Sequence, residues 1–152
     1  MEAADTALER LEALVGRWRT EGWTIDPAGG EGDRIEATDT YERLPGGALL
    51  HLVDARVGDQ KVEGAEIIGF DPQRGNYSTR YFGTDGPAAY EARLREEDGK
   101  TVWDMQSDAD RFTGTFSADG NTITGHWEAV DEDGNWRPWM NITLTRQGAD
   151  EP

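Results

Sequence analysis

The chain has 152 residues, a length that fits one hydrophobic core, so we expect a single domain over residues 1–152. Its 31 acidic and 15 basic side chains give a formal charge of −16, which repels nucleic acids and anionic membranes and makes both poor partners. The chain has no cysteine and no apolar run long enough for a signal peptide or a spanning helix. We therefore expect a cytoplasmic protein without disulfides or thiolate metal sites.

A short helix is predicted at the N-terminus, over about residues 5–15. Thr6 and Glu9 have the spacing of a capping box, which marks a helix start. Four apolar residues then share one helical face: Leu8, Leu11, Leu14 and Val15. Gly16 ends the helix, because glycine favours the backbone conformation that follows a last helical turn. The apolar face needs a surface to cover, so we expect this helix to plug one end of the fold.

From residue 17 to about residue 146 the apolar pattern has a period of two. Gly-containing turn signals interrupt it at short spacing, which predicts about ten antiparallel strands. A meander of this length, with one apolar and one charged face, leaves two exposed edges unless it closes on itself. The fold class that we expect is all-β: an antiparallel up-and-down barrel of about ten strands, plugged by the helix and followed by a polar tail over 147–152.

Tight turns predict which residues face each other across each hairpin, because a two-residue loop fixes the register. The turns used are Gly58-Asp59, Asp85-Gly86, Asp98-Gly99, Asp119-Gly120 and Asp133-Gly134. Asp119-Gly120, for example, places Phe112 opposite Trp127. Asp85-Gly86 places Tyr81 opposite Tyr90 and leaves Arg80 opposite Glu91 on the other face. All five registers predict one apolar inner face and one charged outer face.

The hairpin at Gly58-Asp59 also places His51 opposite Glu66, a polar pair on an otherwise apolar or glycine face. Asp54 and Arg56 lie on the opposite face and belong in water, so His51 and Glu66 should point into the barrel. Such a pair could act as a general acid and base. It could equally be a buried hydrogen-bonded pair that fixes the register, or Glu66 could be solvated near the barrel mouth.

The same inward parity surrounds this pair with aromatic side chains. Most of them should be core, but tyrosine hydroxyls in an aromatic wall are typical of a small-molecule pocket. The predicted ligand-binding residues are His51, Glu66, Tyr77, Tyr81, Tyr90, Trp103, Met105, Phe112 and Trp127, of which His51 and Glu66 are also the catalytic candidates.

The segment Gly16-Arg17-Trp18 resembles the Gly-x-Trp signature at the start of lipocalins and other calycin barrels. The resemblance implies that Trp18 plugs the closed end and that Arg146 of the last strand stacks across it in a cation-π contact. Further segments are similar to a bacterial family of lipocalin-like barrels, a domain of unknown function common in actinobacteria: Tyr41 to Gly47, Val53 to Arg56, Glu66 to Asp71 and Trp136 to Arg146. This resemblance spans most of residues 8–146 and implies a calycin barrel without naming an activity.

No cofactor or metal is predicted. Related haem barrels of the nitrobindin type need an axial histidine on a late strand, and the only late histidine, His126, is predicted to point outward. The acidic loops at Asp108 to Asp110 and Asp131 to Asp133 lack EF-hand spacing, so they should be solvated.

Three tryptophans fall on the outward parity or in a turn: Trp23, Trp136 and Trp139. Together they could form an apolar patch that buries a second subunit, which predicts a homodimer. Packing of these rings against the helix or the loops is the alternative.

The function predicted from these features is binding of one small, largely apolar molecule in the barrel cavity, without catalysis. An isomerase, cyclase or hydrolase that uses His51 and Glu66 is the first alternative. A structural or oligomeric barrel with a filled interior is the second.

Overall fold

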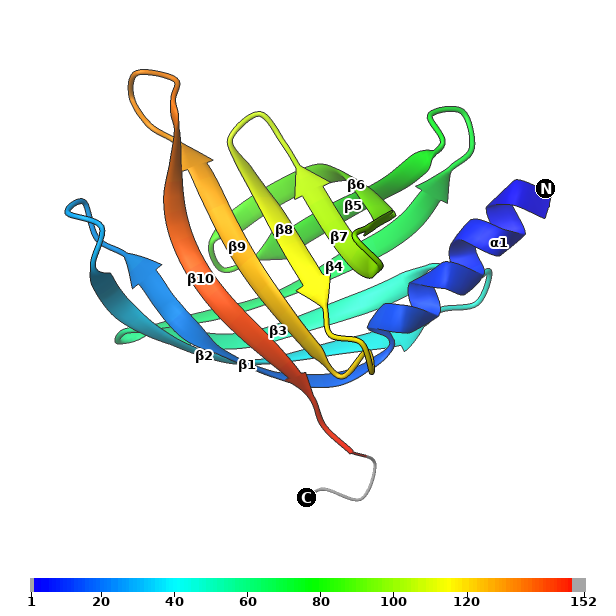
Figure 1. The fold of residues 1–152 in the computed structure, drawn as a ribbon, viewed down its shortest axis with the longest axis horizontal. Helices are drawn as coiled ribbons and strands as arrows, with labels where there is room; N and C mark the ends of the chain where they lie inside the picture. The colour runs from blue at the N-terminus through cyan, green and yellow to red at the C-terminus, as the bar shows by residue number, and fades with distance from the viewer. Residues whose placement is uncertain (1, 149–152) are drawn as a thin grey trace.

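Ten antiparallel strands form a closed barrel in the computed structural model, which describes residues 2–148 (Figure 1). The strands are β1 Gly16–Ile25, β2 Glu31–Arg43, β3 Leu49–Val57, β4 Gln60–Asp71, β5 Asn76–Gly83, β6 Gly86–Glu97, β7 Lys100–Gln106, β8 Asp110–Phe116, β9 Thr122–Val130 and β10 Trp136–Arg146. Each strand pairs with its neighbours in sequence, and β1 closes the barrel by pairing with β10. The predicted fold class is confirmed. Most of the predicted polar tail, residues 149–152, lies outside the described residues.

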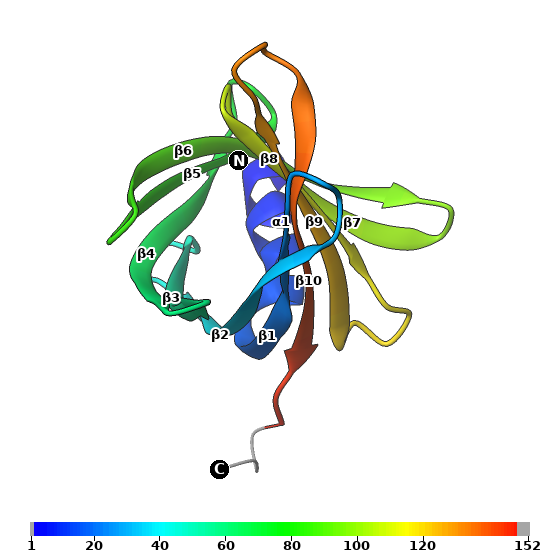
Figure 2. The ribbon, with the colours of Figure 1, turned by 90° about the vertical axis from the view of Figure 1, so that its left-hand side faces the viewer.

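The N-terminal helix, α1, spans Glu2–Arg10 and continues as a 3-10 turn over Leu11–Leu14. The predicted start was wrong, because α1 begins four residues before Thr6, which therefore lies inside the helix. Glutamate and alanine before Thr6 are good helix formers, which extends the helix toward the N-terminus. Looking along the barrel, α1 lies across its far end (Figure 2). Leu11 and Leu14 are fully buried there, so the helix is the plug that its apolar face predicted.

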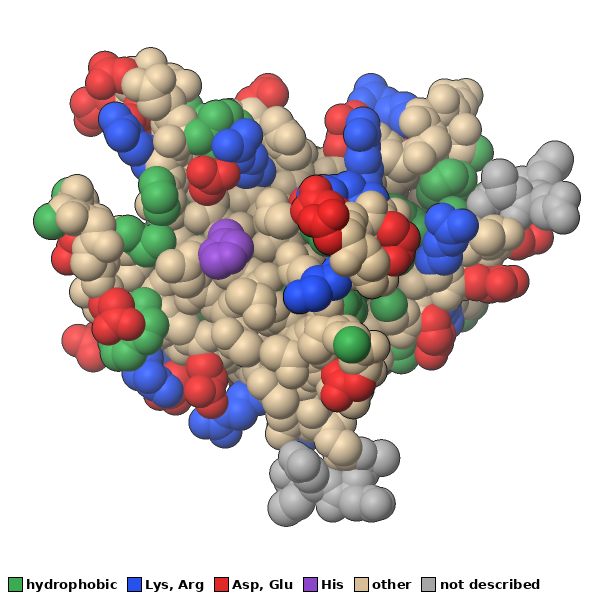
Figure 3. All heavy atoms as spheres, viewed as in Figure 1, with side chains coloured by type: hydrophobic (Ala, Val, Ile, Leu, Met, Phe, Trp, Pro, Cys, Tyr) green, Lys and Arg blue, Asp and Glu red, His purple; other side chains and the backbone are tan. Residues whose placement is uncertain are grey.

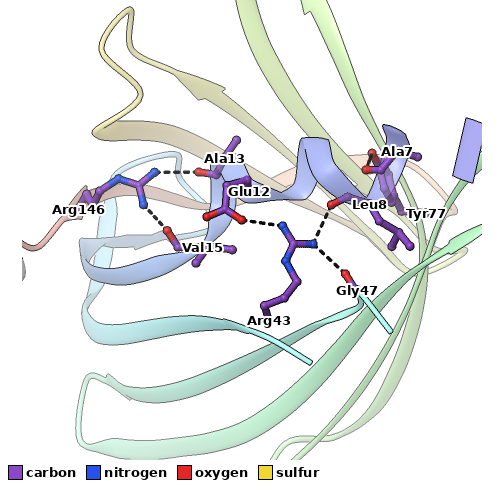
Figure 4. Close-up of polar contacts among 9 residues, drawn as sticks. All are labelled: Ala7, Leu8, Glu12, Ala13, Val15, Arg43, Gly47, Tyr77 and Arg146. Atoms are coloured by element: carbon purple, nitrogen blue, oxygen red, sulfur yellow. Dashed lines mark hydrogen bonds and ion pairs between the residues drawn. The ribbon is translucent and has the colours of Figure 1, made fainter. Parts of the chain in front are cut away.

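Side chains from the strands hold the helix by its main-chain carbonyls (Figure 4). The last carbonyls of a helix have no partner within it and must find donors elsewhere. Three donors meet this need: Arg43 bonds Leu8 O at 2.7 Å, Tyr77 Oη bonds Ala7 O at 2.6 Å, and Arg146 bonds Ala13 O at 2.8 Å. The helix is therefore fixed to three different strands.

Trp18 and Arg146 seal the same end of the barrel. Trp18 is fully buried, and its Nε1 donates a hydrogen bond to Leu14 O at 2.9 Å. The Arg146 guanidinium lies 4.1 Å from the centre of the Trp18 ring, which is the cation-π contact implied by the lipocalin resemblance. Gly16 makes room for it, because a Cβ at this position would lie 2.7 Å from Arg146 Nη1.

The registers predicted from four of the five turns are those of the structure, including Phe112 opposite Trp127. The register predicted for β5 and β6 was wrong by two residues. Tyr81 faces Ala88 instead of Tyr90, because the loop is Thr84-Asp85 between two paired glycines, Gly83 and Gly86.

Arg80 is consequently opposite Ala89 and not opposite Glu91. The glycine at position 83 accommodates the Tyr81 ring, because a Cβ there would lie 2.1 Å from the Tyr81 hydroxyl. A slip of two residues leaves every side chain on its predicted face, so the inner wall is unchanged.

The interior is mostly buried at the helix end and more accessible at the other end. Near the helix, the inward-facing Leu49 and Ile68 are fully buried. Toward the opposite end Ile35 is still buried, but most inward-facing residues are only half-buried, although the register points them into the barrel: Val53, Ala55, Val62, Ala88, Trp127 and Ile142. Solvent therefore reaches the inner wall from the end opposite α1, and we call this part of the barrel the open half.

On the face seen in Figure 3, acidic and basic side chains lie mainly around the rim and the hairpin tips, and the middle of the wall is mostly uncharged. The tryptophans of the predicted patch each pack on a different neighbour: Trp23 on Arg34, Trp136 on Arg111 and Trp139 on Trp127. Besides Trp139, the exposed large apolar residues are Leu52, Ile67 and Phe82 on β3 to β5. The described residues contain no helix both long and apolar enough to cross a bilayer.

Replacing Arg146 with methionine should destabilise the fold by about 2 to 4 kcal/mol, because it leaves helix carbonyls without a donor and removes the contact with Trp18. Urea unfolding followed by tryptophan fluorescence measures this. Arg137→Met on the same strand is the matched control, since its ion pair with Asp131 is exposed and should be worth less than about 1 kcal/mol. Equal losses in the two variants would contradict the sealing role of Arg146.

Candidate functional site

His51 lies on the inner wall with both ring nitrogens bonded to carboxylates. Nδ1 is 2.9 Å from Glu66 Oε1, and Nε2 is 2.7 Å from Asp39 Oδ1. The three residues come from neighbouring strands, β2, β3 and β4, and their side chains are between 5% and 12% exposed. The structure thus brings the two predicted residues together and adds a third, Asp39.

Asp39 was missed in the sequence because β2 carries polar residues on both faces. The available signal was its inward parity with Ile35 and Tyr41. The second oxygen of Asp39, Oδ2, accepts a short hydrogen bond from the Thr20 hydroxyl on β1. Both carboxylate oxygens of Asp39 therefore have partners within the wall.

Tyr41 lies flat against the His51 ring. The ring centres are 4.0 Å apart and the planes differ by 8°. Burial raises the pKa of Tyr41 well above its usual value, and the negative charges of Asp39 and Glu66 raise it further. Tyr41 is therefore a neutral phenol, and its face supports a positive charge on the imidazole.

The two carboxylates make His51 a cation at neutral pH. Burial alone lowers the pKa of His51, but the hydrogen bonds with Asp39 and Glu66, and then their charges, raise it from 6.5 to about 9. A protonated imidazole donates from both nitrogens, which matches two acceptors on opposite sides of the ring. The cluster of Asp39, His51 and Glu66, called the inner triad below, carries two carboxylates and one imidazolium.

The other predicted ligand-binding residues divide into two groups. Tyr77, Trp103, Met105 and Phe112 are buried in the core. The half-buried group lies on the wall of the open half: Tyr81, Tyr90 and Trp127. Of these, Tyr81 is directly opposite Glu66 in the register of β4 and β5. The structure therefore places only part of the predicted set where a molecule in the open half could touch it.

Both tyrosine hydroxyls of the open half donate to carboxylates. Tyr81 bonds Asp85 Oδ1 at 2.6 Å, and Tyr90 bonds Asp110 Oδ2 at 3.0 Å. Burial, followed by these neighbouring carboxylates, raises the pKa of both phenols. Their donors are thus already used within the chain.

In the part of the chain that the structure describes, no group of three or more His, Cys, Asp or Glu side chains is arranged to hold a metal ion. His126 is exposed on the outer wall, as predicted, with Nδ1 2.7 Å from Asn141 Oδ1.

The free energy of unfolding should fall by up to about 3 kcal/mol as the pH rises from about 6.5 to 9. Folding raises the His51 pKa, so the stabilisation is complete below pH 6.5 and is lost as the pH passes the folded value. Urea titrations across this range measure the slope, and an NMR titration of the imidazole protons measures the pKa.

His51→Gln should lack this pH dependence, whereas His126→Gln on the outer wall should keep it. An unchanged slope in His51→Gln, or a His51 resonance that titrates near pH 6.5, would show that the carboxylates do not hold the proton.

Several known structures share this barrel. The S-type phycobiliprotein lyase CPES from Guillardia theta superimposes with a TM-score of 0.64 and 12% identity, over 95% of this chain and 94% of the lyase. A de novo designed fluorescence-activating β-barrel gives a TM-score of 0.44 and 16% identity, over 90% of this chain and 95% of its own. The redesigned barrel mFAP0, bound to DFHBI, gives 0.47 and 12%, over 88% of this chain and 99% of its own.

At such identities the likeness to the lyase shows the fold alone, and the two designed barrels are still more distant. None of the curated proteins compared with the chain is detectably similar in sequence. A family model described as protein of unknown function (DUF1579) matches residues 5–146. The chain therefore belongs to the DUF1579 family.

Proposed function

We propose that the barrel binds one small, largely apolar molecule in its open half and does not transform it. The observation that carries this proposal is the contrast between the two ends of the inner wall. Leu49 and Ile68 are fully buried near the helix, whereas Val53 and Val62 face inward and are only half-buried. A barrel that is sealed at one end and accessible at the other can admit a ligand without unfolding.

The composition of the open half suits such a ligand. Its wall combines aliphatic side chains such as Val53 and Val62 with the aromatic rings of Tyr81, Tyr90 and Trp127. Small-molecule sites are typically concave and mostly apolar, with a few polar groups that fix orientation. The inner triad supplies those polar groups.

The acid-base alternative fits the geometry less well in its use of His51 as the base. A general base needs a free lone pair, yet both nitrogens of His51 are engaged by Glu66 and Asp39. Catalysis by His51 would first require one of these bonds to break. Binding is therefore the function that the contacts support best. The likeness to a lyase does not alter this, because it concerns the fold.

A structural barrel with a filled interior also fits these burial values less well than a ligand-binding barrel does, because a packed interior buries its inward-facing residues. A homodimer, a cytoplasmic location and a single domain over 1–152 remain predictions from the sequence. The exposed side chains of Leu52, Ile67 and Phe82 give a dimer an apolar surface to bury.

Ala88→Trp should weaken binding of the uncharged probe N-phenyl-1-naphthylamine at least tenfold, because the indole would fill the open half. Ala88 faces inward opposite Tyr81, and its neighbour Ala89 is exposed on the outer wall. Ala89→Trp is therefore the matched control and should bind like the native protein. Fluorescence titration gives the affinities.

The native protein should show saturable binding of one probe per chain with a blue-shifted emission. Absence of saturable binding, or equal weakening in Ala88→Trp and Ala89→Trp, would rule out a ligand site in the open half.

A further inference from the structure

The charges of the inner triad do not balance. Asp39 and Glu66 contribute two negative charges, and His51 contributes one positive charge. Arginines at inward-facing positions do not supply the missing one, because Arg43 and Arg146 bond the helix carbonyls at the closed end. The inner wall near the triad is left with one net negative charge.

The negative charge that His51 does not neutralise is assigned to Glu66. Asp39 uses both oxygens, one for His51 and one for Thr20, whereas the hydrogen bond of Glu66 engages Oε1 alone. Among the described residues, only Asn76 Oδ1 and Thr79 Oγ1 are fully enclosed side-chain oxygens without a partner. Glu66 Oε2 has no hydrogen-bond partner among the described residues, and the Glu66 side chain is 5% exposed.

The surroundings of Glu66 disfavour an anion. The phenols of Tyr81 and Tyr90 already donate to Asp85 and Asp110, and these two carboxylates add negative charge to the open half. Burial raises the pKa of both phenols, and the charge of Glu66 contributes to the rise in each. An anionic ligand would meet repulsion and no free cationic side chain there.

A cation would find the opposite conditions. Glu66 Oε2 offers a charge-assisted contact, and the rings of Tyr81 and Trp127 offer faces for cation-π contacts. In a partly buried site these attractions are screened less than on the surface.

We infer that the ligand of this barrel is an organic monocation, with an apolar or aromatic body and one protonated amine or heteroaromatic cation placed beside Glu66. The inference rests on the proposed function, because it names the class of molecule that the open half would bind.

The test compares two dyes of one shape in the native protein: thioflavin T, which is cationic, and its uncharged analogue that lacks the ring N-methyl group. Fluorescence titrations are made at 0.15 M salt, where the Debye length is about 8 Å and the distant charges of the acidic surface are largely screened. We expect thioflavin T to bind at least tenfold more tightly than the uncharged analogue, a ratio consistent with one unscreened charge pair.

Glu66→Gln should reduce this ratio to about two or less, because glutamine keeps the shape and an acceptor but removes the charge. Glu63→Gln is the matched control: it lies on the same strand and removes the same charge, but its side chain is exposed on the outer wall. The control should keep the native ratio. Asp39→Asn replaces Glu66→Gln if circular dichroism shows that the latter is unfolded, because it removes one negative charge from the same triad.

The outcomes separate the two proposals. If neither dye binds the native protein, the ligand-binding function itself fails, and the inference fails with it. If both dyes bind but with equal affinity, or if the inner-triad variant and Glu63→Gln change the ratio alike, binding stands and the cationic class is overturned. Only a cation preference that depends on the inner triad supports the inference.

Discussion

The pairing of β1 with β10 is the constraint on which the rest of this structure depends. A sheet with free edges leaves two strands with unpaired backbone donors and acceptors, and closure gives β1 and β10 a partner on each side. Closure also gives each strand an inside and an outside, so alternate residues must differ in character. A barrel of ten strands is wide enough that side chains do not fill its interior at the end opposite α1. The helix seals only its own end.

Charge placement inside the barrel follows from the same geometry. His51, Asp39 and Glu66 come from adjacent strands at one level, so their side chains meet inside the wall instead of in water. Burial of a histidine alone favours its neutral form, yet two carboxylates outweigh this and hold the proton. Because one imidazolium cannot neutralise two carboxylates, the inner wall keeps one net negative charge. The open half therefore combines this negative charge with the aromatic rings of its wall.

The sequence was sufficient for the fold and for part of the site. Turn dipeptides fix registers locally, so His51 could be placed opposite Glu66 from the single turn at Gly58-Asp59. The β5–β6 hairpin could not be placed, because two adjacent dipeptides, Thr84-Asp85 and Asp85-Gly86, both make acceptable turns. In the structure the loop is Thr84-Asp85, with Gly83 paired to Gly86, and the turn dipeptides alone do not distinguish this register from the other.

Asp39 shows the other limit of periodicity. Its strand is polar on both faces, so alternation does not mark it as an inner residue. Its importance arises from contact with His51, twelve positions away on the next strand. Likewise, the division of the aromatic residues between core and open half depends on where the helix lies along the barrel axis, which no local pattern encodes.

The most direct test of a ligand inside the open half is an NMR measurement of nuclear Overhauser contacts between bound N-phenyl-1-naphthylamine and methyl groups of β3 and β4. Val53 and Val62 face inward, whereas Leu52 and Ile67 are exposed on the outer wall of the same strands. A ligand in the open half gives contacts to Val53 and Val62. Contacts only to Leu52 and Ile67 would place the probe on the outside of the barrel and contradict the account.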